Sequence, residues 1–507
     1  MTSTGGTSNT SSSNNDDVKE VIPMRHEVYT NDKPPTLTGT SSTTTSVATF
    51  VPRRCTASEL KSLSNILELQ SWATAHSMAP SLAAFVNYGS EDEESLRANR
   101  NGFSQYSLRP RVLCNVSRVD TTTTILQGRI SLSAPIGIAP FAGCRAVHPE
   151  GEIAIAKAAA QAGIVYTVPN WAATPLTDIL DNSTCSSNDT SSSLLFQIYA
   201  HKPKFPNREG FDRAHMAALL DYLAHPHSEQ QQRTSNSTKS KIVGVVLTCD
   251  TVNNGNREKT YKNPTWVANL TRETGGGFPA PCALQDANRL PPVAQQGHAA
   301  SMTWDDIRFL KQECHKHHLA LVLKGIMSGD DAVLAAQIGV NAICVSNHGG
   351  RQLDGTQSTI QALEECAAAV QDFYTNKNSN NTNRMEIFVD GGIRRGKDVA
   401  KCLALGAKCV FVGRPVLWGL ALAGQDGVAR ALNILQEELT TVLQLMGCRT
   451  PQQLTRQHVV AREDEQRIIT STIHNTPVRE TGSECWWAVT ISVAVAAFVL
   501  GRYTQRV

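Results

Sequence analysis

The sequence predicts an α/β fold in which eight parallel strands, each followed by a helix, close into a (β/α)8 barrel. From about residue 130, short apolar runs alternate with helical patterns, which is typical of βαβ units. The chain has 507 residues, a length that one barrel with insertions can absorb. We find eight candidate strands and no sign of a ninth. They cover residues 135–139, 164–168, 194–199, 243–248, 319–323, 342–346, 386–389 and 409–412.

The N-terminal segment, residues 1–50, is predicted to be a disordered polar arm. Ser, Thr, Asn and Gly dominate it, so it cannot bury enough apolar surface to offset the entropy of ordering. A cleaved targeting peptide is the alternative, although the arm lacks an apolar signal core and carries Asp16, Asp17 and Glu20. The barrel domain is expected over residues 51–470. Three polar stretches within it, 181–193, 225–241 and 375–384, are expected to be surface insertions.

The C-terminal segment is predicted to be a membrane anchor. A polar linker, residues 471–484, leads into the apolar residues 485–501, which have Trp486 and Trp487 at one end and Arg502 beyond the other. At about 1.5 Å per residue this segment spans about 25 Å, slightly less than a hydrocarbon core of about 30 Å. We expect the catalytic domain to face the cytosol from an organelle membrane, peroxisomal or mitochondrial. A core or oligomer-contact helix is the alternative.

Charge and cysteine usage exclude some classes of protein. The 47 basic and 45 acidic residues give no positive field that would attract nucleic acid. The thirteen cysteines stand without CxxC spacing, which favours small buried side chains in a reducing compartment. The cluster His315–His318 has no Cys or carboxylate at a suitable spacing, so we expect a solvated helix end and no metal site.

The strongest chemical motif runs from Ser346 to Asp354 and reads Ser-Asn-His-Gly-Gly-Arg-Gln-Leu-Asp. It follows a candidate strand directly, and a barrel gathers the C-terminal ends of its strands at the mouth of the active site. His348 and Arg351 are therefore expected to project into that mouth together. Gly349 and Gly350 would let the backbone approach a flat ligand closely.

This segment resembles the family of FMN-dependent (S)-2-hydroxy acid oxidases and dehydrogenases, which includes glycolate oxidase, lactate oxidase and the flavin domain of yeast L-lactate dehydrogenase. The resemblance extends from about residue 58 to residue 462. It implies an FMN cofactor, a 2-hydroxy acid substrate, an electron acceptor such as oxygen, a quinone or a cytochrome, and a homo-oligomer. Its other motifs, in order, are Glu91–Asp92, Asn99–Asn101, Arg109–Arg111, His148–Glu152 and Gly413–Pro415.

The resemblance also implies roles for individual residues. It makes His348 the catalytic base, with Asp250 as its carboxylate partner, and Arg351 the group that binds the substrate carboxylate. Arg257 matches a second arginine near that carboxylate, and Tyr199 matches a tyrosine that hydrogen-bonds the substrate. The chemistry agrees, because loss of a proton and a hydride equivalent requires a base beside an orienting guanidinium. Surface salt bridges are the alternative for Asp250 and Arg257.

Cofactor contacts are implied at the ends of most strands. Lys324 matches a lysine beside the flavin N1 and O2 edge, with an exposed surface lysine as the alternative, and Arg394 and Arg414 match the phosphate contacts. Loops after strands seven and eight of a barrel often form such a phosphate site. The full set of expected cofactor residues is Ala139, Pro140, Ala142, Gln197, Thr248, Lys324, Ser346, Asp390, Gly391, Gly392, Arg394, Gly413 and Arg414.

Three positions depart from the family pattern. Phe85 stands where the family has a tyrosine that binds the substrate carboxylate, although Tyr88 is close enough to supply a hydroxyl. Loss of that hydrogen bond makes glycolate a less favoured substrate and leaves lactate or longer-chain hydroxy acids. Phe141 and Pro169 replace small polar residues near the expected flavin, and Trp171 is expected to face the substrate.

Two other functions stay open at this point. One is another FMN-barrel enzyme, such as an isomerase, and the other is a catalytically silent, membrane-tethered flavoprotein. The pairing of His348 with Arg351 favours oxidation of a 2-hydroxy acid. Either a hydride or a carbanion route is consistent with these residues.

Overall fold

The computed structural model describes residues 50–183, 193–200, 211–226, 241–274, 284, 299–377 and 384–462. The chain divides into two units, Met1–Ala48 and Thr49–Val507, and every described residue lies in the second. The polar arm, the linker and the apolar segment 485–501 lie outside the described residues. Among the described residues, no helix has both the length and the apolar composition needed to cross a membrane.

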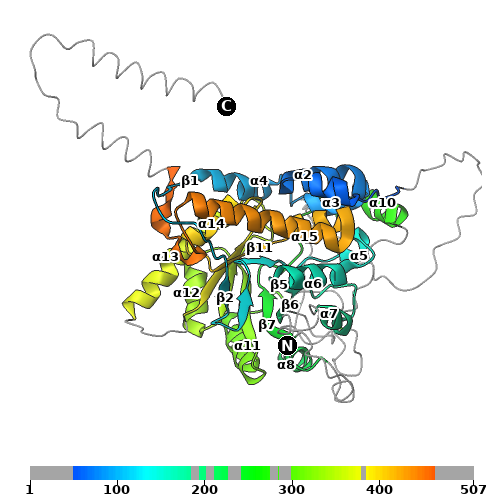
Figure 1. Ribbon diagram of the computed structural model, residues 1–507. Coiled ribbons are helices and arrows are strands. Elements are labelled where there is room, and N and C mark those ends of the chain that lie inside the picture. Colours follow the sequence, from blue (N-terminus) through cyan, green and yellow to red (C-terminus); the bar gives the residue numbers. More distant parts are fainter. Residues whose placement is uncertain are drawn as a thin grey trace, which may run out of the picture. The chain divides into compact units, whose positions relative to one another are not determined.

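Eight parallel strands form a closed barrel, as the sequence predicted (Figure 1). Neighbours in the barrel follow the chain order, and β11 closes it by pairing with β4, with Val410 opposite Ile136. Each of the eight candidate strands is confirmed to within a few residues. The strands are β4 (Ile136–Ile138), β5 (Val165–Val168), β6 (Ser193–Tyr199), β7 (Lys241–Thr248), β8 (Ala320–Ile326), β9 (Ala342–Val345), β10 (Glu386–Asp390) and β11 (Cys409–Val412).

Alternating side chains of these strands fill the inside of the barrel. Small and large residues share the interior, and the rings of Phe388 and Phe411 lie 5.4 Å apart. The hairpin of β2 (Thr123–Ile125) and β3 (Ile130–Leu132) covers the N-terminal opening, because the backbone amides of Leu126 and Gln127 donate to the carboxylate of Glu386 at the start of β10. That opening is therefore closed, and the opposite end is left for ligands.

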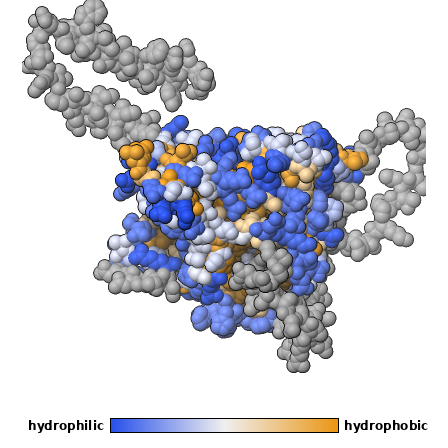
Figure 2. All heavy atoms as spheres, viewed as in Figure 1, coloured by the Kyte–Doolittle hydropathy of each residue, from blue (hydrophilic) through white to orange (hydrophobic). Residues whose placement is uncertain are grey.

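Helices surround the strands and bury their other face. Their sequences carry start and stop signals: Thr303 and Asp306 form a capping box at the start of α11, and α12 ends at Gly339 in the left-handed region. The face of this layer seen in Figure 2 is mostly hydrophilic. The helices are α5 (Cys144–Val147), α6 (Gly151–Ala162), α7 (Leu176–Asn182), α8 (Arg213–Ala224), α10 (Pro264–Thr274), α11 (Trp304–Lys316), α12 (Gly329–Ile338), α13 (Thr359–Asn376), α14 (Gly396–Ala404) and α15 (Arg414–Leu445).

The residues before the barrel form a separate helical layer that the strand pattern did not predict. It lies across the end of the barrel at which α15 begins (Figure 1). A short antiparallel pair, β1 (Tyr106–Leu108) with β12 (Val459–Ala461), joins this layer to the last described residues. The helices of the layer are α1 (Ala57–Ser62), α2 (Ile66–Trp72), η1 (Ala73–Ser77), α3 (Pro80–Asn87), α4 (Glu94–Asn101) and η2 (Gly102–Gln105).

The described cysteines carry no disulfide bond. All ten described cysteines are free thiols, and seven of them, including Cys144, Cys344 and Cys409, are buried as the sequence predicted. Cys55 and Cys249, which the sequence also predicted to be buried, are partly exposed, and Cys114 is exposed.

Candidate active site

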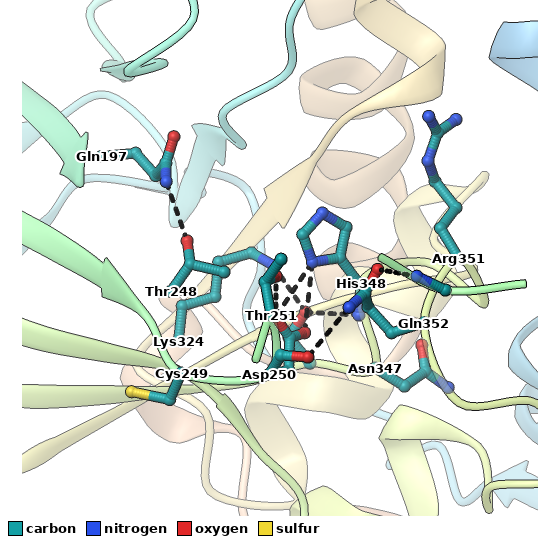
Figure 3. Close-up of polar contacts among 12 residues, drawn as sticks. Gln197, Thr248, Cys249, Asp250, Thr251, Lys324, Asn347, His348, Arg351 and Gln352 are labelled. Atoms are coloured by element: carbon teal, nitrogen blue, oxygen red, sulfur yellow. Dashed lines mark hydrogen bonds and ion pairs between the residues drawn. The ribbon is translucent and has the colours of Figure 1, made fainter. Parts of the chain in front are cut away.

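The residues singled out in the sequence gather at the C-terminal ends of the barrel strands. Tyr199 ends β6, Asp250 follows β7, Lys324 lies near the end of β8, and His348 follows β9. Parallel strands bring these ends to the same rim, so side chains far apart in the sequence become neighbours. Figure 3 shows His348, Asp250 and Lys324 side by side, with Arg351 beyond the imidazole ring and directed away from Asp250.

His348 and Asp250 form the central pair of the site. The imidazole Nδ1 lies 3.0 Å from Oδ1 and 3.2 Å from Oδ2 of the carboxylate. The histidine backbone has φ of 58°, which is uncommon for a residue with a side chain and marks local strain. Its amide donates to Ser346 Oγ at 3.1 Å, and Ser346 in turn accepts from Lys324 Nζ at 3.0 Å. The strained turn is thus held by a buried polar network.

Burial favours a neutral imidazole at His348, and neighbouring positive charges favour an ionised carboxylate at Asp250. Burial lowers the pKa of His348, Asp250 raises it and Lys324 lowers it, and the net shift is downward. Burial raises the pKa of Asp250, but His348 and Lys324 lower it by more than burial raises it. The pKa of Asp250 is therefore well below its usual range. His348 can therefore accept a proton at neutral pH while Asp250 stays charged.

Arg257 and Arg351 approach each other at the C-terminal rim of the barrel. Burial and then the charge of Arg257 lower the pKa of Arg351, and burial lowers the pKa of Arg257. Arg351 donates to the carbonyl of Phe85 at 2.6 Å, and Arg257 Nε donates to the carbonyl of Arg351 at 2.9 Å. Neither arginine forms an ion pair within the described ranges. Two adjacent cations of this kind are suited to bind an anionic ligand.

Aromatic side chains form the wall beside these arginines. The Arg351 guanidinium lies 4.7 Å from the centre of the Phe85 ring, and that ring stacks on Trp266 at 6.1 Å. Tyr261 contacts Phe85 edge-on at 6.1 Å and lies 5.5 Å from Arg257. The sequence did not single out Tyr261 or Trp266, because neither belongs to a recognisable motif. Tyr88 is exposed, with Lys259 over its ring.

Lys324 is buried between acidic groups and is not a surface lysine. Its side chain is 5% exposed, and Nζ lies 3.6 Å from Oδ2 of Asp390. Burial lowers its pKa, whereas Asp390 and Asp250 raise it more, so the ammonium stays charged. Oδ1 of Asp390 has no hydrogen-bond partner among the described residues. Because buried polar atoms are normally hydrogen-bonded, we expect a ligand to donate a hydrogen bond to this oxygen of Asp390.

The side chain of Gln197 in β6 links β7 to the loop after β5 by hydrogen bonds. Gln197 Nε2 donates to Thr248 Oγ1 at 3.0 Å, and Gln197 Oε1 accepts from the amide of Asn170 at 3.0 Å. All three residues are buried, and Oδ1 of Asn170 has no partner in the described part of the chain. Ala139 is buried at the end of β4, next to the partly exposed Pro140 and Ala142. Trp171 is 42% exposed and makes none of these contacts.

Arg394 and Arg414 are two further cations without an ion-pair partner in the described residues. Burial and then Arg414 lower the pKa of Arg394 to about 9, and burial and then Arg257 lower the pKa of Arg414 to about 10. Nε of Arg394 is buried and has no hydrogen-bond partner in the part of the chain that the structure describes. Arg414 donates to the carbonyls of Val86, Gly349 and Tyr88, which uses three of its five N–H groups. The pair is arranged to hold an anionic group near Gly413, the N-cap of α15.

At Gly350 and Gly392, the backbone of α4 occupies the space that a side chain would take. A Cβ at Gly350 would lie 2.6 Å from the amide of Leu96 in α4, and a Cβ at Gly392 would collide with the carbonyl of Asn99. Both glycines have φ above 70°. Gly350 therefore also has a packing role, because the helical layer occupies the space that its side chain would take.

Gln352 is the residue of the motif whose importance the sequence did not reveal. It is buried, and its Nε2 donates to the carbonyls of Asp250 and Asn253 at 3.0 and 2.8 Å. Its Oε1 accepts from the amide of Gly255 at 3.1 Å and from Arg257 Nη2 at 3.2 Å. One amide thus joins the loop that follows β9 to the loop that follows β7. No sequence spacing could indicate this, because the partners come from a different strand.

The chain matches a known family and several known proteins. Residues 74–461 match the family described as FMN-dependent dehydrogenase. The chain is 33% identical over 419 residues to glycolate oxidase 1 of Zea mays, covering 81% of this chain and 99% of that protein. It is 37% identical over 390 residues to L-lactate oxidase of a Nostoc strain, covering 76% and 94%. The crystal structure of mandelate oxidase superposes with a TM-score of 0.59 at 31% identity, covering 77% of this chain and 96% of that one.

Proposed function

Because the chain belongs to the family of FMN-dependent dehydrogenases, we propose that it oxidises an (S)-2-hydroxy acid to the 2-oxo acid with FMN as its cofactor. The observation that carries this proposal is the His348–Asp250 pair next to Arg257 and Arg351, two cations without an ion-pair partner among the described residues. A base and a carboxylate-binding site at one rim are what a 2-hydroxy acid requires. An isomerase needs no such arginines, and a silent flavoprotein needs no polarised histidine.

Each residue of the site has its own role in the proposed oxidation. Arg351 and Arg257 bind the substrate carboxylate and fix its orientation. His348 accepts a proton at Nε2, either from the hydroxyl or from the α carbon, and the ionised Asp250 stabilises the imidazolium that results. Tyr199 lies near Lys324, Asp250 and Arg257, and burial raises its pKa, so its hydroxyl stays protonated and would donate a hydrogen bond to the substrate.

The described residues fit FMN. Arg394, whose buried Nε has no hydrogen-bond partner among the residues that the structure describes, and the N-terminus of α15 would hold the phosphate. Lys324, Gln197, Thr248 and the unpaired Oδ1 of Asn170 would hold the polar edge of the flavin ring. When bound, FMN accepts the electron pair that leaves the substrate. Ser346 and Asp390 keep Lys324 in place and charged.

We also propose that the site favours a substrate with an apolar side chain over glycolate. Phe85 carries no hydroxyl, and its ring, stacked on Trp266, makes the wall beside Arg351 apolar. Tyr261, which lies near both arginines, would supply a hydroxyl toward the carboxylate from another loop. Burial of additional methylene groups against such a wall contributes about 0.8 kcal/mol each.

A single anaerobic experiment tests the function. The purified protein is expected to show flavin absorbance, and 2-hydroxy acids of increasing chain length are expected to bleach it faster than glycolate does. Oxidised absorbance that persists with every acid would contradict the function. Faster bleaching by glycolate than by every longer acid would contradict the proposed substrate preference alone. Admission of air afterwards separates an oxidase, which reoxidises rapidly, from an enzyme that passes electrons to a quinone or a cytochrome.

The segment 485–501 is proposed to anchor the protein in an organelle membrane, peroxisomal or mitochondrial, with the catalytic domain in the cytosol. Its apolar length and its flanking Trp487 and Arg502 support this. Fractionation followed by protease treatment of intact organelles tests it: the barrel should be digested while the protein stays with the membranes. Recovery in the soluble fraction would contradict the anchor.

A homo-oligomer is proposed from the resemblance in sequence. Light scattering of protein that lacks residues 485–507 is expected to give a mass that is a multiple of the chain mass. A monomer mass at micromolar concentration would contradict this proposal.

A further inference from the structure

Helices α8 and α11 lie side by side on the outside of the barrel (Figure 1). Arg213 at the start of α8 pairs with Asp306 at the start of α11, with 2.8 Å between Nη2 and Oδ1. At the other end of the two helices stand Asp221, His225 and His317. One ligand atom from each of these three residues lies within 4.8 Å of the other two.

The spacing of these atoms suits a tetrahedral metal ion. Oδ1 of Asp221 lies 3.4 Å from Nδ1 of His225 and 3.8 Å from Nδ1 of His317. Bonds of about 2.0–2.1 Å to zinc in tetrahedral geometry place two ligand atoms about 3.3 Å apart. The carboxylate and the two imidazoles therefore need only small side-chain rotations to share one ion. These distances are long for hydrogen bonds to the carboxylate; Nδ1 of His225 instead lies 3.2 Å from the backbone carbonyl oxygen of Asp221, a contact that binding of the ion would replace.

The surrounding backbone favours a cation at this point. His225 is the C-cap of α8 and His317 is the C-cap of α11, so the carbonyl ends of both helices meet here. The C-terminal end of a helix carries a partial negative charge. The nearby cation Lys316 is paired with Glu313 at 2.5 Å, which holds its ammonium. Asp221 and His225 are exposed, so a water molecule has room as a fourth ligand.

The sequence alone led us to expect no metal site at His315–His318, but the fold brings Asp221 and His225 of α8 to His317. We propose that Asp221, His225 and His317 form a binding site for a divalent transition-metal ion of the zinc type. Two imidazoles and one carboxylate are the ligand set that such an ion prefers. The site is separate from the active site, because α8 and α11 run back from the mouth and end at the N-terminal ends of the strands. The ion would join the C-terminal ends of the two helices as Arg213 and Asp306 join their N-terminal ends.

Zinc binding to the untagged FMN-loaded protein tests the site. Calorimetric titration with zinc chloride is expected to give one ion per chain and a higher melting temperature. The double variant His225→Ala/His317→Ala is expected to bind at least tenfold more weakly and to lose the temperature shift. The matched control is His315→Ala, which removes an exposed histidine of the same helix end and should bind as the parent does.

Each outcome decides the proposal. Loss of binding in the double variant but not in His315→Ala supports it. Equal affinity in the parent and the double variant would locate the ion elsewhere and overturn it, as would an absence of binding by the parent. Since all three substitutions are at exposed or partly exposed positions, circular dichroism without zinc is expected to be unchanged, which separates loss of the ligand from loss of the fold.

Discussion

The imidazole Nδ1 of His348 lies 3.0 Å from Oδ1 of Asp250. A proton on Nδ1 is donated to the carboxylate, which leaves Nε2 as the nitrogen that can accept a proton. The contact fixes both the tautomer and the direction of the ring. It depends on the left-handed backbone at His348 and on the amide of that residue donating to Ser346.

Substitution of the proposed base should separate cofactor binding from turnover. His348→Gln is expected to keep FMN, because its side chain lies on the substrate side, and to slow flavin reduction by about 10²–10⁴-fold. Anaerobic stopped-flow absorbance measures this. Bleaching at the parent rate would show that His348 is not the base.

The pH dependence follows from the shifted pKa of His348. The pKa lies below its usual value of about 6.5, so the neutral, proton-accepting form persists to below that pH. We expect kcat/KM to rise with pH along an acid limb centred below about 6.5 and then to level off. Asp250→Asn removes the group that raises the pKa of His348, so the limb should move to lower pH while the plateau rate falls. A limb that moves to higher pH in this variant would contradict the pairing.

Gln352 carries no charge, but we expect it to contribute both to stability and to substrate binding. Gln352→Ala removes hydrogen bonds from two carbonyls, one amide and Arg257, and each buried group left unsatisfied costs about 1–3 kcal/mol. We expect a lower melting temperature and a higher KM for the hydroxy acid, since Arg257 loses its support. Gln357→Ala, at an exposed glutamine of the same loop, serves as the control. Equal effects of the two substitutions would show that Gln352 has no special positioning role.

Two neighbouring arginines should differ in their effect on the cofactor. Arg394→Ala is expected to weaken FMN binding by about 1.5–3 kcal/mol, the value of hydrogen bonds to a charged group. Arg395→Ala should change it little, because that side chain pairs with Glu438 at 2.9 Å near the surface. Flavin fluorescence during dilution measures both affinities. A larger loss for Arg395→Ala would contradict the proposed phosphate site.

Tyr261 should act on substrate binding alone. Tyr261→Phe keeps the ring beside Phe85 and removes only the hydroxyl near Arg257 and Arg351. We expect KM to rise by about fivefold to tenfold, about 1 kcal/mol for one hydrogen bond, with FMN content unchanged. Steady-state kinetics with the best hydroxy acid provides the measurement. An unchanged KM would remove Tyr261 from the carboxylate site.

The sequence by itself determined the barrel and the principal chemical groups. The eight strands could be predicted because each is a short apolar run bounded by polar residues. Such a pattern depends only on residues that are close together in the sequence. His348 and Arg351 could be placed at the mouth because they directly follow a strand. The departure at Phe85 was also visible from the sequence.

Only the tertiary structure decided which groups meet. Gln352 reaches Arg257, the ring of Phe85 packs on Trp266, and Asp221 approaches His317, although no spacing in the sequence relates these residues. The space occupied at Gly350 by α4 was likewise hidden, because that contact depends on how a helical layer packs over the barrel. Periodicity reports the face of a single element, whereas these contacts depend on the arrangement of several elements.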